Sequence, residues 1–556
     1  MTCWTSTARQ QFKAISKNNI FTDAALFCRA RLCALAGRKF ALFKRLTAPI
    51  GFEKGRILAK IVTYVAPLNR HAALLFACLG ALLVYGQTVQ FHFVNWDDPP
   101  HVYQNAALLD PAAAAWQDSV FSRNLGYAMP VTLLSWRLDR ALYGPQPPTQ
   151  AEPQMGSGYH TTQLLLILLY VYAAYAFFAL VPLTPWAASW AAFLCVLHPI
   201  AVEPLAWITG RKDLLCGIFV FLALAQLHHA LQQNRPLKRL LLFGLFSVLA
   251  MGSKPIGVLC APLGLFALWT WPRPHAAWPL RRAVLVVFGV GLVALLTVAV
   301  DMQWHRALGG LSDADGVPST LRNALYALGF QTRDWLWPLT LRPKYVVTPP
   351  LGFTPLDALA LVPLLALPVL ALHPRTRTRP VGFAAALAIV AYLPAAGLVG
   401  LRRYIADTYL FLPHAAAALA LASLGSALLD KLPQKSRMFV AFLPLLLLLP
   451  LALPQVSIWR DSVALWAHTQ RLEPDSPQVC RMLGHGYGEE KQPFVAVEMY
   501  EACAQRFGPS LFANNLAVTA FNVGDRDRAK RWFSWILQQD PHNARARRYM
   551  DALKGP

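Results

Sequence analysis

The stretch HTTQLLLILLYVYAAYAFFALV, residues 160–181, contains no Asp, Glu, Lys or Arg and is long enough to cross a bilayer as a helix. Only 14% of the 556 residues are charged and 56% are apolar, whereas soluble domains carry about 25% charge. This composition excludes a purely soluble enzyme, a fibrous protein and a disordered chain. The apolar runs are continuous rather than alternating, which argues against an outer-membrane barrel. We therefore predict an all-α polytopic membrane protein.

The sequence contains eleven apolar runs that are long enough, or nearly long enough, to cross a membrane. They lie at 72–92, 160–181, 186–203, 214–231, 239–253, 256–271, 283–300, 355–372, 381–397, 409–427 and 438–454. The short pair 239–253 and 256–271 is interpreted as a hairpin that turns at Ser253-Lys254-Pro255. A further segment, 320–339, carries Arg322, Arg333 and Asp334 and is predicted to lie at the membrane interface.

Basic residues set the expected orientation. Residues 1–70 hold 13 Lys and Arg against two acidic residues, and the net charge of the chain is +23. In a membrane protein this excess marks cytoplasmic loops and anionic lipid surfaces rather than nucleic acid. Eleven crossings place all the basic loops in the cytoplasm and everything after 454 outside. Those loops are 1–70, the loop with Lys238 and Arg239, the loop with Arg281 and Arg282, 375–379, and the loop with Lys431 and Lys435.

Three regions follow from this reading: a basic tail at 1–70, cytoplasmic or interfacial; a membrane domain at 71–454 with an external loop at 93–158; and an exported tail at 455–556. We find no cleavable signal, and the first apolar run is read as an anchor. The exported tail has dense charge and two similar stretches, 477–507 and 509–542. Their spacing is close to the tetratricopeptide period of about 34 residues, which predicts helix pairs stacked into a short α-solenoid.

The tail contains two cysteines that we expect to lie side by side. Helices at about 478–490 and 493–507 would be antiparallel, and Cys480 and Cys503 are equally far from the turn between them. In an oxidising compartment they would form a disulfide. The alternative is two small side chains at ordinary packing positions.

The external loop begins with Asn95-Trp96-Asp97-Asp98-Pro99-Pro100. Two adjacent carboxylates at a membrane surface must be solvated, paired or used in chemistry. Asp97 could take a proton from an acceptor hydroxyl as a general base, with Asp98 orienting it or joining a metal. The alternative is a loop cap or turn, since Asp-Pro favours turn initiation.

A second segment, HPIAVEPLAWITGRKD at 198–213, links two apolar runs on the same predicted side. A simple connection needs none of its charged side chains. Arg211 and Lys212 could bind a phosphate, and the alternative is interfacial snorkelling with Asp213 as a cap. The candidate site lining from this segment is His198, Glu203, Trp207 and Asp213.

Several further residues complete the candidate site. Lys254, Arg402 and Arg403 are basic residues in turns where topology does not require them, so we expect them to help bind an anionic lipid headgroup. Asp407 and His160 are candidate lining residues. His101, His305 and His414 are more typical of packed or solvated histidines than of metal ligands. No Gly-rich phosphate loop, Ser-His-Asp signature or zinc spacing is present.

Together these stretches resemble membrane glycosyltransferases with a C-terminal tetratricopeptide domain, such as the transmembrane-and-TPR protein O-mannosyltransferases. The resemblance rests on Asn95-Trp-Asp-Asp98 with Asn105, Tyr127-Ala-Met-Pro130, Gly158-Tyr-His160, the 198–213 segment and Ser253-Lys-Pro255, in this order, and covers about 72–556. The chain departs from the family where Tyr-Arg-Pro becomes Tyr127-Ala-Met-Pro130 and where Ala-Asp-Arg-Tyr becomes Ala406-Asp-Thr-Tyr409. Two basic positions of the family pattern are therefore missing from this chain.

The resemblance implies a GT-C fold and an inverting transferase in the inner membrane, with its active site outside. It implies a polyprenyl-phosphate-linked sugar as donor, an exported protein hydroxyl as acceptor and a catalytic carboxylate in the first external loop, which matches Asp97 and Asp98. It leaves a divalent cation open. Two alternatives remain: a non-catalytic scaffold that displays the tetratricopeptide module, and a transporter with charges in a midplane cavity.

Overall fold

The computed structural model describes residues 54–105, 108, 121–122, 127–144, 156–233, 236–272, 280–307, 317–347, 350, 352–396, 405–429 and 431–554. The candidate residues Arg402 and Arg403, and most of the basic tail at 1–70, lie outside these ranges. The described residues up to 68 and those from 69 onward belong to two compact units. The second unit contains every site residue discussed below.

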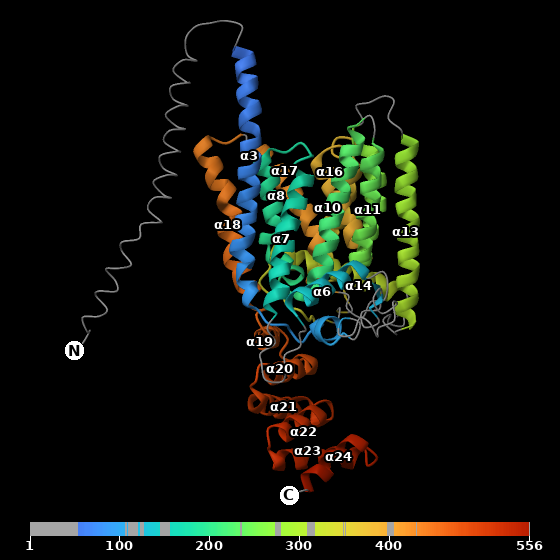
Figure 1. The fold of residues 1–556 in the computed structure, drawn as a ribbon, viewed down its shortest axis with the longest axis vertical. Helices are drawn as coiled ribbons and strands as arrows, with labels where there is room; N and C mark the ends of the chain where they lie inside the picture. The colour runs from blue at the N-terminus through green and yellow to red at the C-terminus, as the bar shows by residue number, and fades with distance from the viewer. Residues whose placement is uncertain are drawn as a thin grey trace, which may run out of the picture. The chain divides into compact units, whose positions relative to one another are not determined.

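The described chain is almost wholly helical, and a helix occupies each of the eleven apolar runs (Figure 1). These helices are α3 (Lys54–Tyr85), α7 (Ser157–Phe178), α8 (Pro185–Leu197), α10 (Arg211–Leu231), α11 (Leu237–Ser253), α12 (Cys260–Thr270), α13 (Leu280–Ala307), α15 (Pro355–Leu372), α16 (Pro380–Tyr392), α17 (Phe411–Leu429) and α18 (Gln434–Ser457). The described strands, β1 (Phe121–Ser122) and β2 (Tyr127–Ala128), pair antiparallel over two residues each. The predicted all-α polytopic membrane fold is confirmed.

Within the part of the chain that the structure describes, six helices are long and apolar enough to cross a membrane on their own, and the number rises to eight if two bent pairs are each one span. The remaining apolar helices of the eleven runs are shorter, such as α12 and α16. The count of eleven crossings therefore stays a prediction. Segment 320–339 forms α14 (Val317–Leu336), which is not among the candidate spans.

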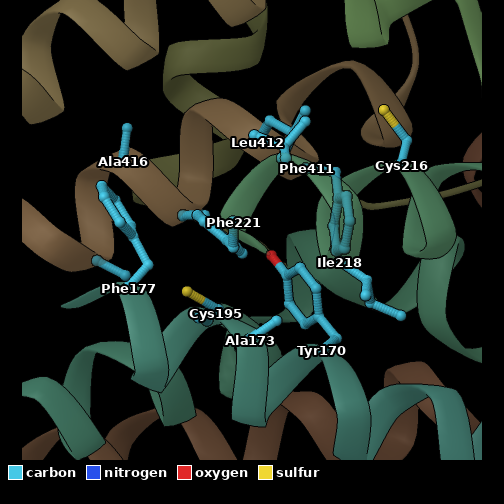
Figure 2. Close-up of a cluster of buried hydrophobic side chains, with 14 of the residues drawn as sticks. Tyr170, Ala173, Phe177, Cys195, Cys216, Ile218, Phe221, Phe411, Leu412 and Ala416 are labelled. Atoms are coloured by element: carbon cyan, nitrogen blue, oxygen red, sulfur yellow. The ribbon is translucent and has the colours of Figure 1, made fainter. Parts of the chain in front are cut away.

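Aromatic side chains fill the centre of the bundle between α7, α8, α10 and α17. Tyr170 of α7 stacks on Phe411 of α17 at 5.0 Å between ring centroids and lies 5.6 Å from Phe221 of α10 (Figure 2). Phe177 stacks on the same Phe221 ring at 6.0 Å. These rings are completely buried or nearly so. Because α10 packs against α7 through this cluster, the start of α10 has a fixed position relative to α7.

The segment 198–213 folds into short helices between α8 and α10. It contains η3 (Pro199–Ala201), α9 (Val202–Ala206) and η4 (Ile208–Gly210), and the chain bends by 63° after α8. A Cβ on Gly210 would lie 2.6 Å from the carbonyl oxygen of Pro204, so only glycine fits there. This close approach folds the segment back on itself and sets where Arg211, Lys212 and Asp213 leave the first turn of α10.

Two other elements lie beside this segment. Helix α6 (Pro130–Tyr143) packs against α10 and α11, and η5 (Pro255–Leu259) follows the turn at Lys254. The predicted hairpin turn is tight, because a Cβ on Gly257 would meet the backbone of Ala250 at 2.4 Å. Thr132 of α6 donates a hydrogen bond to the carbonyl oxygen of Ser253 at 2.9 Å, which fixes the residue before Lys254.

The C-terminal tail contains α19 (Ser462–Leu472), α20 (Pro477–Glu489), α21 (Pro493–Phe507), η8 (Pro509–Leu511), α22 (Ala513–Asn522), α23 (Arg526–Gln539) and α24 (Ala544–Lys554). Each α-helix packs against the next one in the chain (Figure 1). Cys480 and Cys503 form a disulfide between α20 and α21, with 6.0 Å between their Cα atoms. The predicted pairing of these two cysteines is confirmed.

Candidate functional site

The two adjacent carboxylates, Asp97 and Asp98, lie in different surroundings. Asp98 is 1% exposed, and its carboxylate accepts hydrogen bonds from the Val94 amide, the Thr209 amide and the Thr209 hydroxyl at 3.0, 3.1 and 2.5 Å. Burial raises the pKa of Asp98 to about 6, while these hydrogen bonds act in the opposite direction. Asp98 therefore fastens the loop to the 198–213 segment. We use the name site loop for residues 92–98.

Asp97 is only partly buried and lies within electrostatic range of the Lys212 ammonium group. It also lies near enough to Asp98 for the two carboxylates to repel each other. Asp97 is therefore the member of the pair that retains access from outside the protein. The ranking of Asp97 before Asp98 as the catalytic base stays a prediction.

Lys212 occupies the centre of a charged cluster at the start of α10. Its ammonium group donates to the Thr209 carbonyl oxygen at 3.1 Å and lies 4.7 Å from the centre of the Trp207 ring. The carboxylates of Asp213, Asp97 and Glu203 and the ammonium group of Lys254 are within electrostatic range. We call Asp97, Glu203, Lys212, Asp213 and Lys254 the charged cluster.

Lys254 reaches the cluster from the turn after α11. Its ammonium group donates to one carboxylate oxygen of Asp213 at 2.5 Å, with 16% and 5% of the two side chains exposed. The other Asp213 oxygen is buried and has no hydrogen-bond partner within the described part of the chain. Lys212 and Lys254 come together as the sequence predicts, although they are 42 residues apart.

Arg211 lies elsewhere, and its predicted contact with a phosphate needs correction. Its side chain is fully buried and donates to Asp139 of α6, to Gln163 of α7 at 3.1 Å and to the Tyr159 carbonyl oxygen at 2.9 Å. All three guanidinium nitrogens are used inside the protein. Arg211 therefore joins α6, α7 and α10 and cannot bind a phosphate in this conformation.

The remaining candidate residues line or support the site in different ways. Trp207 is buried and stacks on Trp459 at 5.6 Å. His160 is buried with its ring near the His92 carbonyl oxygen at 3.3 Å, so it supports the site loop from beneath. His198 stacks on Trp335 at 5.8 Å, and Asp407 accepts a hydrogen bond from the Tyr345 hydroxyl at 2.5 Å. Asp407 begins η7 (Asp407–Leu410), which packs against η3 and α9.

Several residues of this site were not predicted as site residues, and His101 was expected only to be a packed or solvated histidine. His101 is 2% exposed, its Nδ1 has no hydrogen-bond partner among the described residues, and burial together with nearby Lys212 lowers its pKa to about 3. A neutral imidazole therefore faces the cluster. Thr209, Asp139 and Gln163 were also missed, because their partners come from other helices and no local spacing reveals them.

A large apolar cavity lies between α14, α15, α16 and α17. Its volume is about 800 Å³, and side chains such as Leu325, Leu367, Ala388 and Ala417 line it. The polar side chains in its lining are Gln331, Thr332, Trp335, Tyr392 and His414. Trp335 contacts His198, and Gln331 donates to the carbonyl oxygen of Ala406, the residue before Asp407. The polar lining of the cavity is thus connected to the segments that carry the charged cluster.

The charged cluster does not suit a metal ion. Among the residues that the structure describes, no group of three or more His, Cys, Asp or Glu side chains is arranged to hold one. The Asp98 oxygens are occupied by N–H and O–H donors of the protein, and Lys254 occupies one oxygen of Asp213. Two ammonium groups beside these carboxylates also oppose cation binding.

No protein-family model and no curated protein matches this sequence. Among solved structures, the chain is similar to the oligosaccharyltransferase of Archaeoglobus fulgidus tethered to an acceptor peptide that contains the NVT sequon. The sequence identity is 14% and the TM-score is 0.43, over 77% of this chain and 58% of the archaeal chain. The chain thus covers less than two thirds of that enzyme, and a likeness of this size does not extend to function.

Proposed function

We propose that this protein is a membrane glycosyltransferase of the GT-C class that moves a sugar from a polyprenyl-phosphate donor to a hydroxyl of an exported protein, with inversion. One observation carries the proposal. A partly exposed carboxylate, Asp97, lies within electrostatic range of a buried ammonium group, Lys212, while the adjacent Asp98 is used to hold the loop. General-base catalysis and phosphate binding need these two kinds of group side by side.

Asp97 acts as the general base in this mechanism. Its carboxylate takes the proton of the acceptor hydroxyl while the hydroxyl oxygen forms a bond to the anomeric carbon of the sugar. The bond between that carbon and the phosphate oxygen breaks, and its electron pair leaves with the polyprenyl phosphate. Lys212 and Lys254 stabilise the negative charge that develops on the leaving phosphate. Arg211 and Asp98 are positioning residues.

The apolar cavity suits the lipid part of such a donor. Its walls are almost entirely aliphatic, and an isoprenoid chain needs an apolar site inside or beside the bilayer. Its polar residues Trp335 and Gln331 contact His198 and the backbone beside Asp407. These contacts would join the binding site for the polyprenyl chain to the binding site for the phosphate.

The proposed orientation places the site loop, the charged cluster and the tail outside the inner membrane and the N-terminus in the cytoplasm. The basic loops support this orientation through the positive-inside rule. The Cys480–Cys503 disulfide supports an oxidising compartment for the tail. The helices of the tail would bind the acceptor protein as a tetratricopeptide-like solenoid.

The experiment that tests this proposal is glycoproteomics of exported proteins in a deletion strain. The strain is complemented with wild-type protein, with Asp97→Asn, or with Asp551→Asn as a matched change on the exposed surface of α24. We expect a set of O-linked sugars that wild type and Asp551→Asn restore and Asp97→Asn does not. Equal restoration by Asp97→Asn, at equal expression, would instead support a non-catalytic scaffold.

A further inference from the structure

The site loop is bonded to the C-terminal tail, although more than 360 residues separate them. The amide of His92 donates to the Arg460 carbonyl oxygen at 2.8 Å, and its imidazole lies 3.0 Å from the Glu490 carboxylate. The Trp96 ring packs edge-on against Trp466 of α19 at 5.3 Å. The loop that carries Asp97 is therefore partly built by the tail.

Asn95 is the centre of this connection, which we call the loop–tail contact. It is 3% exposed, and its backbone amide donates to the Ser462 hydroxyl at 3.0 Å. Its side-chain oxygen accepts from the Trp466 indole N–H. Its side-chain nitrogen donates to the Met482 carbonyl oxygen at 3.2 Å, with the His485 ring at the same distance. The polar atoms of this side chain are thus directed to α19 and α20.

The opposite end of the loop is fixed by a different part of the protein. Asp98 is bonded to Thr209 of the 198–213 segment, so Asp97 lies between an anchor on the tail and an anchor on the membrane domain. A residue held on both sides has little freedom to move. Loss of the tail anchor would leave the position of Asp97 to be set by Asp98 alone.

A second external loop has the same kind of anchor. Arg342, which follows α14, donates twice to the Glu473 carboxylate at the end of α19, at 2.7 and 2.9 Å. The Val346 amide donates to the same carboxylate at 3.0 Å. Tyr345, which precedes Val346, donates from its hydroxyl to the Asp407 carboxylate. Helix α19 therefore fixes two loops that reach the candidate site.

We infer that α19 and α20 are a positioning element of the active site, and that Asn95 and Trp466 are positioning residues for Asp97 through their mutual hydrogen bond. This inference rests on the proposed function for its effect on transfer. It assigns the first helices of the tail a role in the rate of the chemical step, in addition to any role of the tail in acceptor binding.

The test uses the full-length protein in lipid nanodiscs with Asn95→Ala, Trp466→Phe and the double variant. Asn515→Ala is the matched control, because Asn515 also bonds to an aromatic side chain, the Tyr500 hydroxyl, within the tail. Hydrogen exchange of the amides from 93 to 98 reports the loop directly. Transfer from a radiolabelled polyprenyl-phosphate sugar reports kcat and the KM for the donor.

We expect faster exchange of these amides in both single variants and wild-type exchange in Asn515→Ala. The value of kcat should fall roughly 10-fold or more while the donor KM changes less than about two-fold, since misplacement of a base affects the chemical step. The double variant should be little worse than Asn95→Ala alone, because Asn95→Ala already removes the bond to Trp466 together with the side-chain contacts to Met482 and His485. Trp466→Phe keeps the aromatic ring, so it remains informative if Asn95→Ala folds poorly.

Wild-type exchange at 93–98 in Trp466→Phe would overturn the inference, as would additive losses in the double variant. A rise in donor KM with unchanged kcat would also overturn it. If the wild-type protein transfers no sugar, the proposed function fails, and the exchange measurement alone then decides whether the tail holds the loop.

Discussion

At the scale of single residues, neighbours in the sequence have different tasks. Asp97 is partly exposed, whereas Asp98 is hydrogen-bonded inside the protein. Lys212 lies near the carboxylates of the charged cluster, whereas Arg211 is bonded to Asp139 on α6. Burial and hydrogen-bond partners decide these roles, since the two residues of each pair carry a charge of the same sign.

The first prediction concerns the dependence of activity on pH. Asp98 holds the loop in its ionised form, because its partners Val94 and Thr209 donate hydrogen bonds to it, and burial raises its pKa to about 6. Below that pH it takes up a proton, one oxygen stops accepting, and kcat should fall. The Thr209 hydroxyl lowers this pKa, so Thr209→Ala should move the inflection to higher pH. An inflection that stays in place in the kcat profile of Thr209→Ala would exclude Asp98 as its origin.

The second prediction contrasts Arg211→Met with Lys212→Met. Loss of Arg211 leaves the Asp139 carboxylate buried without its cation, which should cost about 3–5 kcal/mol of stability. Loss of Lys212 removes one buried charge from a cluster that keeps Lys254, so its effect on stability should be smaller and its effect on transfer larger. Thermal denaturation in detergent and transfer assays on both variants measure this contrast. Equal losses of stability would argue against the separation.

At the scale of elements, local patterns predicted much of what the structure contains. Helices α20 and α21 begin and end within one residue of the expected bounds, because Ser476, Pro477, Pro493 and Gly508 mark helix ends. The equal spacing of Cys480 and Cys503 from the turn was enough to pair them. In contrast, the partners of Arg211 and Asn95 could not be predicted, because they lie on helices between 48 and 390 residues away.

The third prediction concerns the disulfide. Denatured, unreduced protein should show no thiol labelling of Cys480 or Cys503, while Cys195, Cys216 and Cys260 in the same sample should be labelled. Replacement of both tail cysteines by serine should destabilise the tail by about 2–4 kcal/mol, because the cross-link restricts the unfolded chain. Limited proteolysis of the tail measures this loss. Labelling of Cys480 or Cys503 at the level of Cys195 would mean that the bond does not form.

At the scale of the whole molecule, composition predicted a multi-pass helical protein and the structure agrees. The number of crossings does not follow from composition, because several apolar helices are short and the chain bends by 63° after α8. The apolar cavity was not foreseen at all. Its walls come from four helices, α14 to α17, and hydrophobic periodicity does not show where neighbouring helices leave space.

The fourth prediction concerns the cavity. Ala388→Trp should fill part of its volume of about 800 Å³ and raise the KM for long-chain polyprenyl-phosphate sugars, with less effect on short-chain donors. Leu295→Trp is the control, because Leu295 of α13 is 68% exposed and does not line the cavity. Steady-state kinetics with donors of two chain lengths measure the difference. Equal KM changes for both donors would show that the polyprenyl chain of the donor binds elsewhere.

The most direct measurement of the central claim is the single-turnover transfer rate of purified protein with a polyprenyl-phosphate sugar and an acceptor that the glycoproteomic comparison identifies. Asp97→Asn keeps the size of the side chain and removes the base, so the rate should fall about 10²-fold or more while donor binding persists. Asp551→Asn should match wild type. A wild-type rate in Asp97→Asn would contradict the assignment of Asp97 as the catalytic base.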